Sequence, residues 1–183
     1  LVELMGGRDA FIGKLDSLFT ADSKLEGEST SVDISGPIGQ YAHGNEPSHH
    51  IAHLYNYVGQ PWRTQEIVDE VLHTLYFNNP DGLSGNEDCG QMSAWYILNA
   101  MGFYQVCPGK PVYSIGRPLF NEATVHLKDG KSFKVIAHNN SRDNKYVRSI
   151  VLNGNKLETP FFTHQDIVDG GTLELTMGSE PLK

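Results

Sequence analysis

The chain has little cysteine, no long apolar run and no cluster of positive charge, and each of these absences excludes a class of protein. Its two cysteines, Cys89 and Cys107, are too few for a disulfide framework, and their spacing matches no zinc-binding pattern. No apolar stretch approaches the roughly 20 residues that a membrane-spanning helix needs. With 14 Lys and Arg against 22 Asp and Glu, the chain lacks the basic surface of a nucleic-acid-binding protein. We therefore expect neither a nucleic-acid partner nor a membrane span.

What the chain does have is enough apolar sequence to build a core. Hydrophobic residues make up 39% of its 183 residues, which is typical of a folded protein of one ordinary domain or two small ones. The first five residues, LVELM, look like the middle of an amphipathic run rather than its start. We expect an upstream part of the same polypeptide, because these residues also lack the zones of a signal peptide.

The first part of the chain has apolar residues at helical spacing. Four segments show this period, and proline or glycine breaks separate them: residues 8–19, 46–58, 61–76 and 89–101. The last of these is apolar on nearly every side, so we expect it to be a buried helix. The intervening residues 20–43 are rich in Ser, Thr, Gly and Asp and are predicted to be a long loop. Residues 1–107 are thus predicted to form a helical region.

The pattern changes to alternation over residues 108–183. An Asp-Gly pair at 129–130 and an Asn-Gly pair at 153–154 each lie between two alternating apolar segments, which predicts two tight hairpins. Residues 172–177 are predicted to form a last strand, and residues 163–167 a single helical turn. The fold class is therefore predicted to be α+β, with this second part forming a small antiparallel sheet or sandwich.

The first candidate site is residues 44–50 (GNEPSHH), at a loop-to-helix junction. Asn45 and Glu46 would lie at the positive end of a helix, where oxygen ligands suit a hard cation such as Ca²⁺, or where Glu46 simply complements the helix dipole. His49 and His53, like Glu46 and His50, are four residues apart, which also permits a zinc or di-iron site. A polar pocket with hydrogen-bonded histidines is the interpretation we favour.

The second candidate site is residues 85–91 (GNEDCGQ), which again lead into a helix. Adjacent carboxylates such as Glu87 and Asp88 repel when ionised, so their pKa values separate or they recruit a cation, and both outcomes are useful to a hydrolase. Asp88 could instead cap the helix. The repeat of Gly-Asn-Glu at 44–46 and 85–87 favours two helix ends that face one pocket.

Longer stretches of the chain resemble glycoside hydrolase family 92, the calcium-dependent α-mannosidases. The resemblance rests on the two motifs and their extensions, namely residues 44–50, 85–96 (GNEDCGQMSAWY), 102–109 (GFYQVCPG), 116–120 (GRPLF) and 139–141 (NNS). It implies that residues 1–107 are the C-terminal part of a helical catalytic domain, part of an (α/α)6 barrel, joined to the β unit of residues 108–183. It also implies exo-cleavage of terminal α-linked mannose from glycans with inversion of configuration. We expect an α-1,2 preference and a periplasmic or extracellular location.

The resemblance also implies roles for particular residues. Inversion needs one carboxylic acid and one carboxylate that activates water. We expect the general acid to lie upstream of this chain, so that the isolated chain is incomplete and inactive. The expected site residues are the catalytic Asp88 and Glu87, the calcium ligands Glu46 and Asn45, and the substrate-binding His49, His50, Trp62 and Asn86.

Two interpretations without hydrolysis compete with the enzyme. A carbohydrate-binding module would use the aromatic residues of the β region, although Tyr113, Phe120, Phe133, Phe161 and Phe162 lie in apolar, strand-like stretches that indicate core. A structural module would use the helices as a scaffold that the β region supports.

Overall fold

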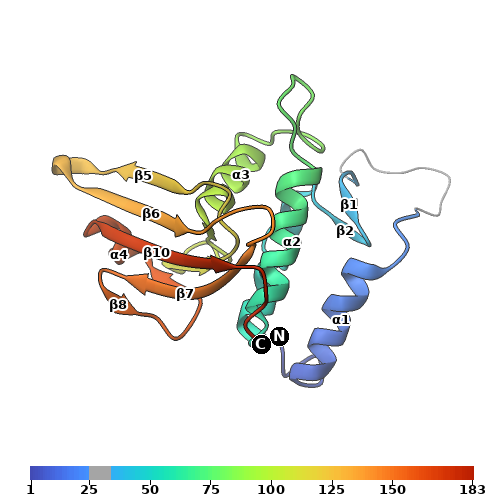
Figure 1. Ribbon diagram of the computed structural model, residues 1–183. Helices are drawn as coiled ribbons and strands as arrows, with labels where there is room; N and C mark the ends of the chain where they lie inside the picture. The colour runs from blue at the N-terminus through green and yellow to red at the C-terminus, as the bar shows by residue number, and fades with distance from the viewer. Residues whose placement is uncertain (25–33) are drawn as a thin grey trace.

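The computed structural model describes residues 1–24 and 34–183 of the chain. It is a mixed α+β structure in which the two longest helices, α1 and α2, lie on one side and the largest sheet on the other (Figure 1). The helical elements are α1 (Arg8–Thr20), η1 (Glu46–Ser48), η2 (Ile51–Val58), α2 (Pro61–Thr74), α3 (Gln91–Met101), η3 (Lys128–Gly130) and α4 (His164–Val168). None of the helices in the described ranges combines the length and apolarity that a bilayer crossing requires.

The helical part is organised around one apolar cluster. Phe11, Leu15 and Phe19 recur at helical spacing on α1 and are buried against η2 and α2. Pro61 occupies the first turn of α2, where its missing N–H costs nothing, and Gly59 ends η2 in the left-handed conformation. The helices predicted over residues 8–19 and 61–76 are therefore confirmed.

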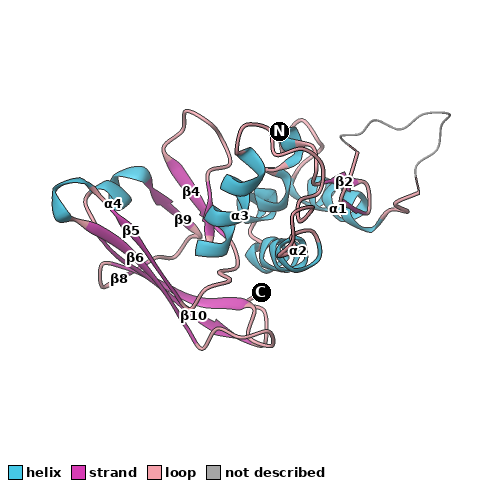
Figure 2. Ribbon diagram, turned by 90° about the horizontal axis from the view of Figure 1, so that it is seen from above, coloured by secondary structure: helices cyan, strands magenta, loops and turns pink. Residues whose placement is uncertain are grey.

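Two larger sheets lie within residues 103–178. One has the strand order β5-β6-β10-β7-β8 and the other the order β3-β4-β9. Their bounds are β3 (Phe103–Tyr104), β4 (Val112–Ile115), β5 (Glu122–His126), β6 (Ser132–His138), β7 (Tyr146–Leu152), β8 (Asn155–Lys156), β9 (Phe161–Thr163) and β10 (Gly171–Gly178). The sheets face each other in the view from above (Figure 2), and Phe103, Phe133 and Phe162 pack between them. This core is separate from the helical cluster.

Both hairpins predicted from the sequence are present. Asp129 and Gly130 have φ of 61° and 72°, and Asn153 and Gly154 have φ of 50° and 79°, as tight turns between antiparallel strands require. The prediction of an antiparallel unit is wrong at one pair, because β10 runs parallel to β6 while it pairs antiparallel with β7. A parallel pair needs a long crossover connection. The chain between β6 and β10, including α4, supplies it.

Three other predictions need correction. Residues 46–58 form two 3₁₀ segments, η1 and η2, rather than one α-helix. The helix α3 is not buried on all sides, since Ile97 is 50% exposed. The predicted loop over residues 20–43 contains a short antiparallel pair, β1 (Pro37–Ile38) and β2 (Tyr41–Ala42), and part of that loop lies outside the described residues.

Buried polar contacts join the helices to the sheets. Asp69 on α2 forms an ion pair with the buried Arg117, with 2.9 Å between Oδ1 and Nε. The Gln65 side-chain oxygen accepts a hydrogen bond from the backbone N–H of Val147 on β7. His53 on η2 contacts Ser114 on β4. These contacts fix how the helical residues sit against the β unit, although the division at residue 107 stays a prediction.

Candidate active site

The two acidic loop-to-helix corners meet at one cavity. Its volume is about 590 Å³, and both Glu46 and Asp88 line it. The other lining residues are Pro47, His49, His50, Gln91, Tyr104, Gln105, Val106 and Pro108. A more apolar hollow of about 680 Å³ shares His50, Val106 and Pro108 with it. The sequence prediction that the two corners converge therefore holds in the structure.

Glu46 lines this cavity and has one buried carboxylate oxygen without a partner among the described residues. It is the first residue of η1, and the hydroxyl of Ser48 fixes the corner by donating to the backbone carbonyls of Ala42 and Asn45. Glu46 Oε1 is buried and has no hydrogen-bond partner among the described residues. A buried carboxylate oxygen without a partner is costly, so a cation or a donor from a ligand would compensate it. This single carboxylate oxygen is of the kind that ligates a hard cation.

Asp88 sits in an unusual stretch of backbone. Asp88, Cys89 and Gly90 have φ of 48°, 56° and 91°, so three consecutive residues adopt the left-handed conformation. Only glycine adopts it without cost, and non-glycine residues held there concentrate at functional sites. This turn directs the chain into α3 and leaves Asp88 exposed at the cavity.

The neighbouring Glu87 is engaged elsewhere. Its two carboxylate oxygens accept hydrogen bonds from the backbone N–H and the hydroxyl of Ser93, at 3.0 and 2.9 Å. Glu87 is not among the residues that line the cavity. It therefore satisfies the N-terminal end of α3, a task that the sequence assigned as one option to Asp88.

Buried histidines lie beneath the cavity. His49 is 1% exposed, and its ring stacks on that of His43 with 4.8 Å between centroids. Burial lowers the pKa of His49, and it lowers the pKa of His43 to about 3, so both rings are neutral at pH 7. His43 in turn contacts the hydroxyls of Tyr41 and Tyr76. The favoured prediction of a polar pocket with hydrogen-bonded histidines agrees with this geometry.

A zinc or di-iron site finds no support in the geometry. His53 is fully buried and hydrogen-bonds Ser114 Oγ and Asn99 Oδ1, while His49 bonds the His43 carbonyl and Gln91. Among residues 1–24 and 34–183, no group of three His, Cys, Asp or Glu side chains could hold a metal ion by itself.

Of the remaining predicted site residues, only some line the cavity between Glu46 and Asp88. His50 lines the cavity, whereas Asn45 and Asn86 flank the two corners without lining it. Trp62 lies on α2 and lines another cavity of about 150 Å³, against β7 and residues 156–160. The structure therefore does not bring Trp62 together with Glu46 and Asp88.

Sequence reasoning missed Gln91 and Tyr104 as individual lining residues. Both belong to motifs singled out above, but neither is a carboxylate or a histidine, so no argument from charge or metal binding selected them. Gln91 is the first residue of α3 and Tyr104 ends β3. They meet only because β3 follows α3 immediately and folds back along it.

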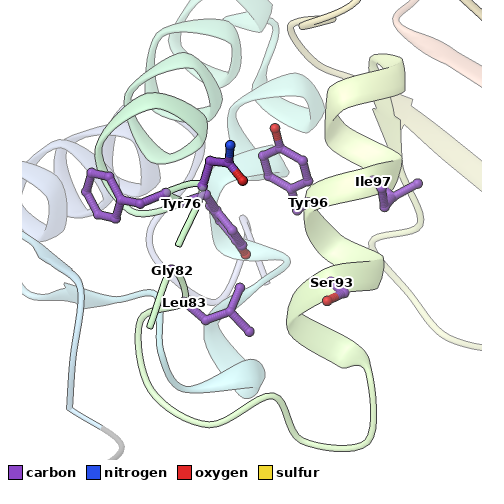
Figure 3. A pocket seen from close by; sticks show the side chains of 8 residues that line it. Tyr76, Gly82, Leu83, Ser93, Tyr96 and Ile97 are labelled. Atoms are coloured by element: carbon purple, nitrogen blue, oxygen red, sulfur yellow. The ribbon is translucent and has the colours of Figure 1, made fainter. Parts of the chain in front are cut away.

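Another cavity, of about 540 Å³, lies on the other face of α3 (Figure 3). Ser93, Tyr96 and Ile97 of α3 line it together with Tyr76 and with Leu83 from the preceding loop. The rings of Tyr76 and Tyr96 are 4.8 Å apart, and no carboxylate lines the cavity. It lacks the acid-base groups of the first cavity.

Comparisons with known proteins identify relatives for the whole chain. The catalytic domain of glycosyl hydrolase family 92 matches residues 1–179. A family 92 α-mannosidase from Bacteroides thetaiotaomicron has 44% sequence identity and a TM-score of 0.87, over 96% of this chain and 23% of that one. An inverting family 92 mannosidase from the same species has 43% identity and a TM-score of 0.82, over 98% of this chain and 25% of that one.

A third relative is described as an uncharacterized secreted glycosidase of Arthroderma benhamiae. It is 30% identical over 183 residues, which is 98% of this chain and 21% of the relative. The chain therefore spans between about a fifth and a quarter of the length of the proteins it matches.

Proposed function

Because the chain belongs to glycosyl hydrolase family 92, we propose that it forms part of the catalytic region of an exo-acting α-mannosidase. The cavity between Glu46 and Asp88 would receive the terminal mannose of a mannose-containing glycan, with α-1,2-linked mannose as the preferred substrate. Two similar solved structures are mannosidases at more than 40% identity, which supports this assignment. The observation that carries it is the convergence of the two acidic corners on one cavity.

Asp88 is the proposed general base. In an inverting glycosidase, one carboxylate removes a proton from water as that water attacks the anomeric carbon, while an acid protonates the leaving oxygen on the opposite face. Asp88 is exposed at the cavity and its carboxylate has no hydrogen-bond partner among the described residues, whereas the carboxylate of Glu87 is bonded to Ser93. The proton donor is proposed to come from the rest of the enzyme, outside this chain, so the chain alone would be inactive.

Glu46 is the proposed calcium ligand from this chain, with Asn45 beside it. Its buried Oε1 is the feature that fits a cation. Bound calcium would supply positive charge that polarises sugar hydroxyls. Glu46 would hold the ion through its carboxylate, and the half-buried His50 would bind a hydroxyl of the sugar beside it. His49, expected from the sequence to bind substrate, has both ring nitrogens engaged by His43 and Gln91, so it would act on the sugar through Gln91.

The whole enzyme is proposed to contain an (α/α)6 barrel to which α1, α2 and α3 contribute. A longer polypeptide is required for such a ring, and the relatives are four to five times as long as this chain, as their coverage of 21–25% implies. We further propose that the enzyme acts outside the cytoplasm, in line with the secreted relative.

The stereochemistry of the first product tests this proposal. An enzyme of the relatives' full length that carries this chain should release β-mannose first from α-1,2-mannobiose, as followed by ¹H NMR of the anomeric protons. The 183-residue chain alone should release none. The α-anomer as first product, or turnover by the chain alone, would contradict the proposed inversion or the proposed external acid.

A further inference from the structure

The side-chain amide of Gln91 is held in one orientation at the floor of the cavity. Its Nε2 lies 3.1 Å from His49 Nδ1 and 3.1 Å from the hydroxyl oxygen of Tyr104. An amide NH₂ group carries two hydrogens, so both can be used by these two acceptors. Gln91 is itself half-buried and lines the cavity.

The tautomer of His49 explains why the nitrogen, and not the oxygen, faces inward. His49 Nε2 lies 3.0 Å from the backbone carbonyl oxygen of His43, and a carbonyl only accepts, so Nε2 carries the proton. In a neutral imidazole the other nitrogen, Nδ1, is then an acceptor. Burial lowers the pKa of His49, which agrees with the neutral form. Only the NH₂ end of Gln91 can therefore point at His49.

This arrangement uses only the nitrogen of the Gln91 side-chain amide, and the oxygen has no partner among the described residues. No described residue donates a hydrogen bond to Oε1, and this atom is not shielded from solvent. Because the nitrogen is fixed beneath, the oxygen is presented toward the cavity as an acceptor. Without His49 and Tyr104, a glutamine could turn either end of its amide outward, since the two ends have the same shape.

We propose that Gln91 is a specificity-determining residue whose Oε1 accepts a hydrogen bond from one hydroxyl of the sugar in the cavity, with His49 and Tyr104 as positioning residues. This inference rests on the proposed function, because it takes a sugar as the occupant. A site built to bond one hydroxyl discriminates strongly against a sugar that lacks it.

Deoxy sugars provide the test. The full-length enzyme and its Gln91→Met variant would be compared on an aryl α-mannoside and on its 2-, 3-, 4- and 6-deoxy analogues. Each variant is compared with the unmodified enzyme on the same substrate, so the intrinsic reactivity of each analogue cancels. One analogue lacks the hydroxyl that Gln91 bonds, and on that analogue the substitution has no hydrogen bond to remove. We therefore expect Gln91→Met to lower kcat/KM about tenfold more on the parent sugar than on that analogue.

Two further variants complete the test. Tyr104→Phe removes one of the two acceptors that hold the amide, so its smaller loss of about two- to threefold should depend on the same hydroxyl. Gln165→Leu, a matched change on the exposed α4 helix, should alter none of the values. Equal losses on all five substrates, or no loss on the parent, would overturn the role of Gln91. Absence of turnover by the unmodified enzyme would overturn the proposed function, and this inference with it.

Discussion

The two hydrophobic clusters of the chain differ in what is buried with them. The cluster between the sheets consists of apolar side chains such as Phe133, Leu173 and Leu175, all of them fully buried. Around the helical cluster, fully buried polar side chains are packed among the apolar ones: His43, His49, His53, Asn56, Gln65 and Asn99. Burying such groups costs free energy unless each is hydrogen-bonded. Most buried polar side chains of the described residues therefore belong to the helical part, which carries the cavity. The two in the β unit, Ser114 and Arg117, contact the helical residues His53 and Asp69.

The same contrast appears in the backbone. Asp129 and Asn153 adopt the left-handed conformation in the β unit, where hairpin turns require it and where Asp and Asn tolerate it. Asp88 and Cys89 adopt it consecutively in front of α3, where no hairpin requires it. Asn139, after β6, adopts it too, but Cys89 is the one such non-glycine residue in the described ranges that is neither Asp nor Asn, and it lies on the cavity side.

The largest effect should come from Asp88, the carboxylate on the cavity side. Asp88→Asn keeps the shape of the side chain but cannot take up a proton, so kcat of the full-length enzyme should fall by about 10²- to 10⁴-fold. Asp169→Asn, a matched change in the β unit, should leave kcat within twofold, roughly. Initial rates of mannose release measure both. Equal rates for Asp88→Asn and the unmodified enzyme would show that Asp88 is not the general base.

The apolar core of the β unit should dominate stability. Phe133 is fully buried between the sheets, so Phe133→Ala should lower the free energy of unfolding by about 3 to 5 kcal/mol. Urea unfolding followed by circular dichroism measures the change, with the exposed Phe120→Ala as a control. A loss below about 1 kcal/mol would show that this core is not tightly packed.

Acid should destabilise the helical part through its buried histidines. Burial lowers the pKa of His53 to about 4, against about 6.5 in the unfolded chain. Between these two values the unfolded chain binds a proton that the folded chain does not, so stability falls as the pH drops from 6.5 to 4. This amounts to about 3 kcal/mol for one such group.

His53→Gln removes this titration, and it should therefore flatten the decline in stability over the same pH range. Urea unfolding at a series of pH values is the measurement, and His126→Gln, on the exposed side of β5, is the control. If both variants declined as steeply as the unmodified protein, burial of neutral His53 would not be the cause.

A smaller effect is expected at Glu87, whose carboxylate bonds Ser93 at the end of α3. Glu87→Ala should cost about 1 kcal/mol of stability, the usual effect of losing a helix cap, whereas Glu158→Ala on the surface should cost almost nothing. Thermal unfolding measures both. A loss of turnover comparable to that of Asp88→Asn, at unchanged stability, would instead assign chemistry to Glu87.

The smallest effect concerns the strained backbone. Cys89→Gly relieves a left-handed residue that is neither Asp nor Asn, so it should stabilise the chain by about 0.5 to 1 kcal/mol. Asn153→Gly, at a hairpin turn, should bring no gain, because Asn already tolerates that conformation and its Oδ1 accepts a hydrogen bond from the Thr172 N–H. Equal gains at the two positions would show that residues 88–90 are not specially strained.

The β unit could be predicted from the sequence because its signals are local. The pairs Asp129-Gly130 and Asn153-Gly154 predict tight turns, and the strands on either side of each turn pair antiparallel as expected. The parallel pairing of β10 with β6 could not be predicted, since it depends on where the chain between them leads the last strand. Likewise, the 3₁₀ conformation of η1 and η2 could not be predicted, because their apolar spacing is the same as that of an α-helix.

For the candidate site, the motifs predicted the acidic corners but not their partners. Glu46 and Asp88 were identified from carboxylates beside glycines, and they converge. That Glu87 bonds Ser93, that Trp62 lies at another cavity and that Gln91 is held by His49 follow from side-chain directions. Residue order alone does not determine those directions.

The most direct test is a crystal structure of the full-length enzyme grown with calcium and mannoimidazole, a ligand bound in one of the similar Bacteroides structures. We predict a calcium ion on the Glu46 carboxylate and the sugar mimic in the cavity between Glu46 and Asp88. A ligand bound elsewhere, with both carboxylates facing only water, would contradict the account.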